Sequence, residues 1–361
     1  MNEATEIRKG EELDKTKLTT FIKNEMRLNI DSLHISQFAG GYSNLTYLLE
    51  INETIKWVLR KPPVGANIKS GHDMSREYHV LKALFPSYNK VPKPILFCND
   101  LDILGSDFYI MEKVEGWILR SGTATDFLPA PDKMKHIFNL FTDNFVILHQ
   151  LDIHDIGLSS LAVEPENYPE RQIFGWTKRY FNSKTEDVAS VENLAHWLAG
   201  HIPKTSGISL IHNDYKYDNL VLDPLSNDIN AVLDWEMSTI GDPLMDVGSS
   251  LGYWVNADDP DWLKDINISP TTLPGNPSRE ELLNGYALRS GKDPGNGVFY
   301  FAYGMFKLAV IAQQIYARYK GGHTRNPKFA NLHKVVDACG GRKSGFKVKE
   351  SFGFGNGRNI D

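Results

Sequence analysis

The hydrophobic and polar positions of the first 60 residues change from a helical to a strand-like pattern. The run LTTFIKNEM, before residue 34, has the mixed apolar spacing of a leading helix. Two apolar runs rich in β-branched and aromatic residues follow at Leu45 to Ile51 and Ile55 to Leu59. Asn52-Glu53-Thr54 lies between them and has the composition of a hairpin turn. The pattern therefore predicts one helix followed by an antiparallel pair of strands.

A second helix and two further strands are predicted after this hairpin. Met74 to Leu84, MSREYHVLKAL, places apolar residues at helical spacing, and Pro86 limits its extension. Short apolar runs at Pro94 to Phe97 and Phe108 to Met111 have polar turn residues between them. The order strand, strand, helix, strand, strand describes a small α+β domain that ends near residue 113.

The rest of the chain is predicted to be mostly helical around a small sheet. The expected helices are His136 to Leu151, Glu170 to Asn182, Val191 to His201 and Phe299 to Lys320, and the expected strands are Asn219 to Leu222 and Ala231 to Asp234. The chain has 361 residues, of which 41% are hydrophobic, so two globular units with substantial cores are expected. We place an N-terminal lobe at 1–113, a C-terminal lobe at 114–340 and a partly mobile tail at 341–361.

Charge and cysteine usage argue against several classes of protein. The net charge of -6 gives no electrostatic support for binding nucleic acid or an anionic membrane. The N-terminal segment is charged where a secretory signal would be apolar, and no later stretch has the roughly 20 apolar residues of a spanning helix. Cys98 and Cys339 are far apart, so neither a disulfide framework nor a zinc site is predicted. We expect a soluble, cytoplasmic protein, and its oligomeric state stays open.

Two neighbouring polar segments carry the strongest functional signal. Asp214 follows an apolar run in IHNDYKYDNLVLDP, and Asn219 comes five residues later. Asp234 ends another strand in NAVLDWE, fifteen residues after Asn219. Phosphoryl transfer from ATP needs a carboxylate that receives the proton of the attacking hydroxyl, and an amide oxygen and a carboxylate that hold Mg²⁺. Asp214 suits the first role, and Asn219 with Asp234 suits the second.

A purely structural interpretation of these residues is that each caps a turn of its own backbone. This structural interpretation would be sufficient for any one of these residues taken alone. The set of His212, Asp214, Asn219 and Asp234, however, has the order and spacing that a kinase site requires at the ends of strands. The set therefore favours a kinase.

These motifs resemble the aminoglycoside phosphotransferase family, whose members share the protein-kinase fold. The family contains H-x-D-x-x-x-x-N, matched by His212 to Asn219, and D-[WF]-E, matched by Asp234 to Glu236. Gly241-Asp242-Pro243 and Asp246 also match, whereas the D-F-G and A-P-E motifs of protein kinases do not occur. The resemblance covers roughly residues 35 to 325 and implies a two-lobed, kinase-like α+β fold with a mostly helical C-terminal lobe. It also implies that Asp246 is a structural anchor.

The resemblance further implies which residues of the N-terminal lobe bind the nucleotide. The loop FAGGYSN, Phe38 to Asn44, is similar to the family's nucleotide loop, and Phe108 to Gly116 resembles the hinge that binds adenine. In the loop, small residues let backbone N–H groups approach phosphates. In the hinge, a backbone carbonyl and a backbone amide bind adenine. The implied nucleotide-binding residues are Gly40, Gly41, Ser43, Asn44, Arg60, Glu77, Met111, Glu112 and Val114.

Arg60 departs from the lysine that most kinases have at this strand position. It resembles the branch of the family that is fused to, or encoded beside, acyl-CoA dehydrogenases, with its L-R-[KR]-P-P run, here Leu59 to Pro63. Arginine stays charged and can bind phosphate oxygens with two parallel hydrogen bonds. Glu77 is the implied partner of Arg60 in an ion pair, and Lys61 should face the opposite side of the strand.

The helical lobe of this family recognises the acceptor. The candidate acceptor-binding residues are Arg171, Trp176, Tyr253, Trp254 and Arg318. Aromatic residues at helical spacing are more often core residues, and His149 is interpreted as a core histidine without a chemical role. The mixture of arginine with aromatic residues favours an anionic or acyl-type hydroxylated acceptor, such as a hydroxy acid or a hydroxyacyl compound, over an antibiotic.

The expected activity is transfer of the γ-phosphoryl group of ATP, with Mg²⁺, to a hydroxyl of a small molecule. An aminoglycoside, choline, homoserine or fructosamine kinase is an alternative within the same fold, and GTP could replace ATP. A nucleotide-binding pseudokinase is a second alternative, motivated by Arg60. Asp214, Asn219 and Asp234 argue against it, because a protein without catalysis has no need of a proton acceptor.

Overall fold

The computed structural model of the chain describes residues 4–38, 44–63, 73–265, 269–295, 297–322 and 327–340. The chain forms two compact units. Unit 1 consists of Met1–Ile118 and Asn219–Met237, and unit 2 consists of Leu119–Asp218 and Ser238–Asp361. Residues 219–237, expected in the C-terminal lobe, thus group with unit 1. The lobe limits drawn from the sequence stay a prediction, and the expected tail lies outside the described residues.

Unit 1 is built on a six-stranded antiparallel sheet in the order β1-β2-β3-β4-β6-β5. The strands are β1 (Ala4–Thr5), β2 (Leu33–Phe38), β3 (Leu45–Ile51), β4 (Ile55–Lys61), β5 (Pro94–Cys98) and β6 (Phe108–Glu112). The predicted hairpin is confirmed, because β3 pairs with β4 from Ile51 opposite Ile55. Asn52 and Glu53 in its turn have φ of 50° and 62°, as a tight hairpin turn requires.

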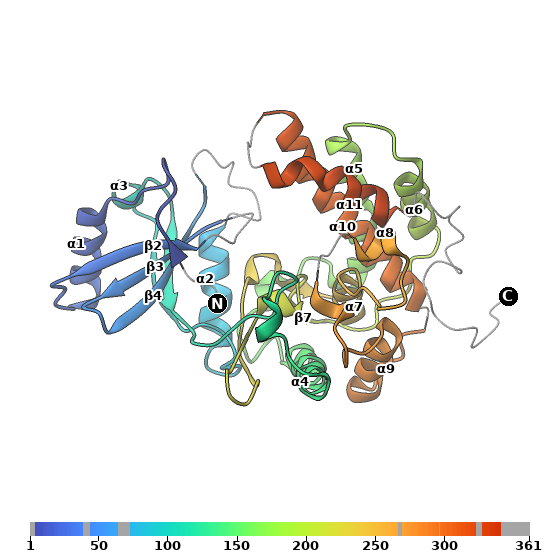
Figure 1. The fold of residues 1–361 in the computed structure, drawn as a ribbon, viewed down its shortest axis with the longest axis horizontal. Coiled ribbons are helices and arrows are strands. Elements are labelled where there is room, and N and C mark those ends of the chain that lie inside the picture. The colour runs from blue at the N-terminus through green and yellow to red at the C-terminus, as the bar shows by residue number, and fades with distance from the viewer. Residues whose placement is uncertain are drawn as a thin grey trace. The chain divides into compact units, whose positions relative to one another are not determined.

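The two faces of this sheet carry different helices. Alternate residues such as Tyr47, Leu49 and Leu59 form one core with Leu18 and Ile22 of α1 (Lys15–Met26), and the four-residue helix α3 (Leu101–Leu104) lies beside α1. The other face packs against α2 (Met74–Leu84), which contacts β5 and β6. Figure 1 shows α1 and α2 on opposite sides of the strands. Because side chains alternate along a strand, Arg60 faces α2 while its neighbours face α1.

A second hairpin completes unit 1. It consists of β8 (Leu220–Leu222) and β9 (Ile229–Val232), followed by the short helix η5 (Trp235–Met237). The backbone of Trp117 bonds to Leu222 in both directions, at 2.9 and 2.8 Å, and the Val232 amide donates to the Lys90 carbonyl. These bonds to residues 90 and 117 explain why the hairpin belongs to unit 1 although it lies 100 residues further along the chain.

Unit 2 is mostly helical, as the sequence predicts. Its α-helices are α4 (Pro131–Gln150), α5 (Tyr168–Ser183), α6 (Ala189–Ala199), α7 (Pro243–Leu251), the four-residue α8 (Asp261–Lys264), α9 (Arg279–Ser290), α10 (Gly297–Lys320) and α11 (Leu332–Cys339). Its 3-10 helices are η1 (Thr125–Phe127), η2 (Ser159–Leu161), η3 (Pro165–Asn167), η6 (Pro270–Thr272) and η7 (Pro327–Asn331), and η4 (Tyr217–Asn219) lies where the chain passes from unit 2 to unit 1. A two-stranded sheet joins β7 (Ser209–Ile211) to β10 (Thr239–Gly241). The expected α+β class, with one antiparallel sheet unit and one mostly helical unit, is thereby confirmed.

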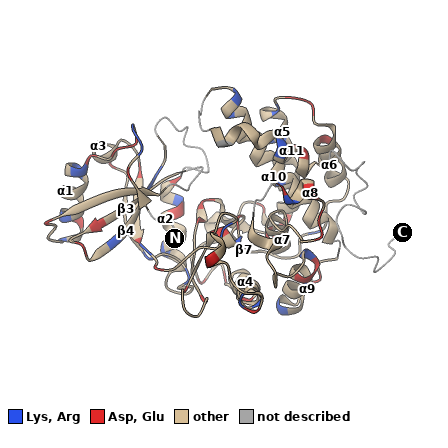
Figure 2. Ribbon diagram, viewed as in Figure 1, with Lys and Arg blue, Asp and Glu red and all other residues tan. Residues whose placement is uncertain are grey.

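Helix α10 is the central element of unit 2. It packs against α5, α6, α7 and α11. Against the expectation from sequence, α10 is long and apolar enough to cross a membrane, but 78% of its apolar window is buried inside the protein. This degree of burial is that of a core helix. Figure 2 shows acidic and basic residues interspersed over the elements of both units, whereas the ribbon of α10 is largely uncharged.

Candidate functional site

The β8–β9 hairpin of unit 1 brings the two expected metal ligands to one end of a small sheet. Leu220 pairs with Val232, so Asn219 and Asp234 lie just beyond the last pair of strands. The Leu233 amide donates to the Asn219 carbonyl at 2.8 Å, which fixes the two segments to each other. Asp234 has a left-handed backbone with φ of 69°, and its side chain is 35% exposed. A strained backbone at a polar strand end is typical of a functional position.

Arg60 lies among three carboxyl groups of unit 1. Its Nη1 donates to Glu77 Oε1 at 2.7 Å, and its Nη2 donates to Asp234 Oδ1 at 3.2 Å and Glu236 Oε2 at 3.3 Å. Arg60 is 9% exposed and Glu77 is 1% exposed. The ion pair expected between Arg60 and Glu77 is therefore present, and it also includes both acidic residues of the Asp-Trp-Glu motif.

Burial and charge act against each other in this cluster. Burial would lower the pKa of Arg60, but Glu77 and the other acids more than offset it, so the guanidinium stays protonated. Burial also raises the pKa of Glu77, and the positive charge of Arg60 opposes that rise. Since a buried carboxylate is costly without a cation, Arg60 is what allows Glu77 to be buried.

The nucleotide loop is described only at its end. Asn44 is buried and donates through Nδ2 to Glu236 Oε2 at 2.8 Å, so it joins the Arg60 cluster. Gly40, Gly41 and Ser43 lie outside the described residues. Glu236 is a residue of this cluster that the sequence reasoning did not select. Its place next to Asp234 in the Asp-Trp-Glu motif was the available signal.

The predicted hinge continues from β6. Met111 is buried opposite Val58 of β4, and Glu112 is paired with Trp57. The Glu112 amide donates to the Lys93 carbonyl at 2.9 Å, and its side chain forms an ion pair with Lys93 at 3.3 Å. Val114 is half-buried. Adenine binding by the Glu112 carbonyl and the Val114 amide stays a prediction.

The amide oxygen of Asn219 and the carboxylate of Asp234, both in unit 1, suit a divalent cation that is also bound by phosphate oxygens. Among the described residues no group of three or more His, Cys, Asp and Glu could hold a metal ion. A kinase-type Mg²⁺ site needs only one or two protein ligands, because phosphates and water supply the rest. The cluster sets three carboxyl groups against one guanidinium, so it is short of positive charge. Asn219 and Asp234 are the residues that would hold Mg²⁺.

In unit 2, a buried carboxylate holds the turn that carries Asp214. Asp246, in the first turn of α7, accepts from the His212 amide at 2.6 Å and the Asn213 amide at 2.7 Å. Asn213 has a left-handed backbone with φ of 66°. His149 is buried between Asp246, at 3.1 Å, and the Tyr286 hydroxyl, at 2.8 Å. The interpretations of Asp246 as an anchor and of His149 as a core histidine agree with these contacts.

Asp214 is paired with a lysine that the sequence reasoning did not select. Lys216 Nζ donates to both carboxylate oxygens of Asp214 at 2.9 Å, and it lies 4.3 Å from the ring centroid of Tyr253. Burial raises the pKa of Asp214, but the charge and hydrogen bonds of Lys216 more than offset it, so this pKa lies below its usual value. Asp214 is therefore ionised at neutral pH. A cation two residues after the loop aspartate was the signal in the sequence.

The five candidate acceptor-binding residues occupy different environments in unit 2. Trp176 is buried on α5, with the Arg179 guanidinium 4.6 Å from its ring, and Arg171 is half-buried beside Tyr168. Tyr253 lies beside Lys216 and, through it, next to Asp214. Arg318 is exposed in the last turn of α10.

Trp254 lies in the aromatic core of unit 2. Its Nε1 donates to the Pro277 carbonyl at 2.8 Å, and its ring packs against Phe138, Phe141 and Tyr217. This environment favours a structural role for Trp254. Acceptor binding by the other four candidates stays a prediction.

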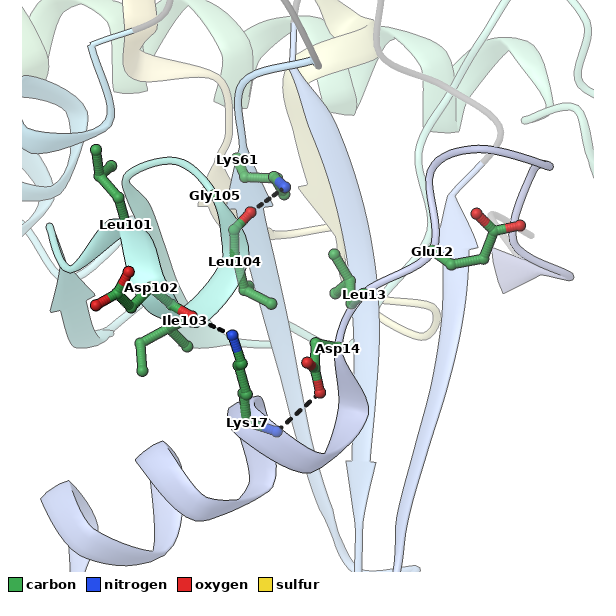
Figure 3. Close-up of a pocket in the computed structure, with 10 residues that line it drawn as sticks. All are labelled: Glu12, Leu13, Asp14, Lys17, Lys61, Leu101, Asp102, Ile103, Leu104 and Gly105. Atoms are coloured by element: carbon green, nitrogen blue, oxygen red, sulfur yellow. Dashed lines mark hydrogen bonds between the residues drawn. The ribbon is translucent and has the colours of Figure 1, made fainter.

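A pocket of about 390 Å³ lies on the face of the unit 1 sheet opposite to Arg60. Figure 3 shows Lys61 there, donating to the Leu104 carbonyl at 2.9 Å, and Lys17 donating to the Asp102 carbonyl at 2.8 Å. Burial lowers the pKa of Lys61. The expectation that Lys61 faces away from the Arg60 side is confirmed, and the pocket is separate from the Arg60 cluster.

The fold and these two clusters define a small-molecule phosphotransferase of the kinase-like type. Residues 34–282 match the phosphotransferase enzyme family, and the chain belongs to this family. The resemblance stated from the motifs is thereby confirmed.

The curated relatives include acyl-CoA dehydrogenase family member 11 of Rattus norvegicus, which is 37% identical over 308 residues. The match covers 84% of this chain and 39% of that protein. This chain thus spans about two fifths of the length of that relative. The resemblance to the branch associated with acyl-CoA dehydrogenases is confirmed.

Solved structures agree with the family. A Ralstonia eutropha protein assigned to the aminoglycoside phosphotransferases has a TM-score of 0.75 and 30% identity, and the match covers 91% of this chain and 96% of that one. Aminoglycoside phosphotransferase APH(4)-Ia, solved with AMP-PNP and hygromycin B, has a TM-score of 0.57 and covers 92% of this chain and 100% of its own. At 14% identity, the second similarity shows the fold alone.

Proposed function

We propose that this chain transfers the γ-phosphoryl group of ATP to a hydroxyl group of a small molecule and requires Mg²⁺. The observation that carries the proposal is Asp214, a carboxylate held ionised by Lys216 in a turn that Asp246 anchors. An oriented, ionised carboxylate is the group that phosphoryl transfer requires next to the attacking hydroxyl.

Asp214 would orient the acceptor hydroxyl and receive its proton. The acceptor oxygen forms a bond to the γ-phosphorus, the bond from that phosphorus to the oxygen bridging to the β-phosphate breaks, and ADP leaves. Because Asp214 is ionised at neutral pH, no earlier proton loss is needed. The catalytic contribution is thus orientation together with a final proton transfer.

The residues of unit 1 would bind the nucleotide. Arg60 offers a charged guanidinium that can bind phosphate oxygens with two hydrogen bonds, and Glu77 holds that guanidinium in place. When bound, Mg²⁺ would neutralise the negative charge of the phosphates, and Asn219 and Asp234 would hold it. ATP as the phosphoryl donor, which the family resemblance implies, is part of this proposal. A cytoplasmic location is part of this proposal.

An anionic or acyl-type acceptor, such as a hydroxy acid or a hydroxyacyl compound, is favoured by the charges around Asp214. Lys216 contacts Asp214 directly, and Lys307 and Arg179 act on the same group of charges. An anionic group of the acceptor would be attracted by these cations, because opposite charges that are close together lower the free energy in a partly buried site. The relationship to acyl-CoA dehydrogenase family member 11 points in the same direction.

The test is transfer of label from [γ-³²P]ATP to a library of hydroxy acids, hydroxyacyl thioesters, amino alcohols and aminoglycosides, with and without Mg²⁺. We expect labelled hydroxy acids or hydroxyacyl thioesters and little labelling of aminoglycosides. Asp214→Asn should lower turnover by about 10²- to 10⁴-fold. Asp258→Asn, an exposed aspartate of unit 2, is the matched control and should keep full activity. Full activity of Asp214→Asn, or a clear preference for aminoglycosides, would contradict the proposal.

A further inference from the structure

The apolar helix α10 carries one buried lysine near its middle. Lys307 is 4% exposed, and its ammonium donates to the Asn213 carbonyl at 2.6 Å and to Ser249 Oγ at 3.0 Å. Asn213 Oδ1 lies at 3.5 Å from the same nitrogen. Asn213 precedes Asp214, so this lysine of the core helix is bonded to the peptide group that joins Asn213 to Asp214.

Burying a charged ammonium group costs free energy, and packing alone does not require it. Burial lowers the pKa of Lys307 to about 8, although Asp246 and Asp214 oppose this shift. The other charged groups that act on Lys307 are Lys216 and Arg179. An apolar side chain of similar size would fill the same space without the cost of removing a charge from water. The position of Lys307 therefore points to a role for its hydrogen bonds and charge.

The contacts of Asn213 show what that role is. Its amide donates to Asp246 Oδ1, its carbonyl accepts from Lys307, and its side-chain oxygen accepts from the Tyr168 hydroxyl at 3.0 Å. Asn213 is thus held by hydrogen bonds to its amide, its carbonyl and its side chain, in a left-handed conformation that asparagine adopts more readily than most L-residues. The orientation of the next residue, Asp214, follows from the direction of this peptide group.

We propose that Lys307 is a positioning residue of the phosphotransfer site, whose buried ammonium fixes the Asn213 carbonyl and thereby the orientation of Asp214. The inference rests on the proposed function, because it assumes that Asp214 receives the acceptor proton. Asp246 holds the amide side of the turn and Lys307 holds the carbonyl side. The two charges are complementary, so the turn is clamped by an anion from α7 and a cation from α10.

The first test compares Lys307→Arg, Lys307→Gln and Lys307→Met, with water as acceptor and release of phosphate from Mg²⁺-ATP as the readout. Lys307→Met should lower kcat by about 10²-fold, the cost of a misplaced catalytic group, while KM for ATP stays unchanged. Lys307→Arg keeps the charge and should recover part of the turnover. Lys320→Met, the same change at an exposed position of α10, is the matched control and should behave as the wild type.

The pH profile separates positioning from general structure. With the unchanged chain, kcat should fall above about pH 8 as Lys307 loses its proton. This alkaline fall should be absent in Lys307→Gln, which is neutral throughout, and in Lys307→Arg, which stays charged. An alkaline fall that persists unchanged in both variants would overturn the proposal.

A second measurement does not depend on turnover. Hydrogen exchange of the Asn213 and Asp214 amides should become faster in Lys307→Met, while the amide of Val247 in α7 should exchange as before. If the wild-type protein neither hydrolyses ATP nor transfers its γ-phosphoryl group to an acceptor, the proposed function is wrong. The hydrogen-exchange rates then still decide whether Lys307 fixes the turn before Asp214. Equal acceleration at Val247 would show a purely structural role, and unchanged exchange at Asn213 and Asp214 would also overturn the proposal.

Discussion

Arg60 lies among three carboxyl groups, and its removal would leave a buried acid without a cation. Arg60→Ala should lower the free energy of unfolding by about 3–5 kcal/mol, because Glu77 would remain buried and unpaired. Arg60→Lys should cost less, since one ammonium can still contact Glu77. Chemical denaturation in urea measures both variants. Lys56→Ala, an exposed lysine of the same strand, should change stability by no more than about 0.5 kcal/mol. Unchanged stability of Arg60→Ala would show that the pair does not hold Glu77 in the core.

Asp234 is expected to act on the metal, in contrast to Asp214. Asp234→Asn should remove the Mg²⁺-dependent part of ATP binding, because a neutral amide is a weaker ligand for a hard cation than a carboxylate. Asp214→Asn should keep that part, since Asp214 belongs to unit 2 and is paired with Lys216. Calorimetric titration of both variants with ATP, with and without Mg²⁺, makes the comparison. An equal loss in the two variants would contradict this division of roles.

The sequence predicted the site residues that belong to recognisable short motifs or to positions that the family resemblance implies. Arg60 and Asp246 were selected because each has a fixed place in a run of characteristic residues, and Glu77 because the family resemblance implies an acidic partner for Arg60 on the next helix. Lys307 was not selected, because the residues near it in the sequence do not indicate which group its ammonium contacts. Asn213 lies 94 residues earlier in the chain, and only the packing of α10 brings the two together.

At the scale of elements, helices α7 and α10 meet at glycines. A Cβ atom built on Gly248 would lie 2.7 Å from the Tyr300 carbonyl oxygen, and one on Gly304 would lie 2.9 Å from Gly252 Cα. The two backbones are therefore in direct contact. Since α7 carries Asp246 and α10 carries Lys307, this contact sets the distance between the two groups that hold the Asp214 turn.

Gly304→Ala should separate α7 from α10. We expect a loss of about 1–3 kcal/mol in the free energy of unfolding, because a backbone cannot yield to the added methyl group. Turnover should fall as well, since Asp246 and Lys307 would move apart. Thermal unfolding and kcat measure the two effects. Gly175→Ala in α5 is the control, because its added Cβ would meet only Arg179 at 3.7 Å, and helix propensity should stabilise it by up to about 1 kcal/mol. If Gly304→Ala changed neither stability nor kcat, the backbones of α7 and α10 would not be in close contact at this position.

The periodicity of the sequence predicted the elements with a regular apolar pattern and missed helices α7 and α9. Helix α10 and the β3–β4 hairpin were predicted because each has a long regular apolar pattern. Helix α7 was missed because it has only nine residues and is buried on all sides, so it has no polar stripe. Helix α9 was missed although Ser278 and Glu281 form a capping box at its start, which is a readable signal.

For the molecule as a whole, buried carboxylates should make stability depend on acid pH. Asp214 and Asp246 have pKa values below their usual 3.8, since Lys216 and His149 respectively outweigh the effect of burial. Groups with a depressed folded pKa contribute stability that is present above the unfolded pKa and is lost as the pH falls through the folded value. The free energy of unfolding should therefore decrease below about pH 4.

Denaturation at a series of pH values between about 2 and 7 checks this expectation. The slope of stability against pH should be smaller in Asp246→Asn, which has no carboxylate to protonate at that position. Asp258→Asn should retain the slope of the unchanged chain. An identical slope in Asp246→Asn would show that the anchor of the Asp214 turn does not contribute to acid unfolding.

The discontinuity of unit 1 has a consequence for synthesis on the ribosome. The segment Asn219–Met237, which contains the β8–β9 hairpin and Asp234, is complete only 119 residues after Ile118, because Leu119–Asp218 of unit 2 is made in between. At about 5–20 residues per second, roughly 6–24 s pass before the sheet of unit 1 can receive its last hairpin. During that interval Glu77 and Arg60 have each other but neither acid of the Asp-Trp-Glu motif. A nascent chain halted before residue 219 should therefore hold an incomplete unit 1, and release of the next 19 residues should complete it.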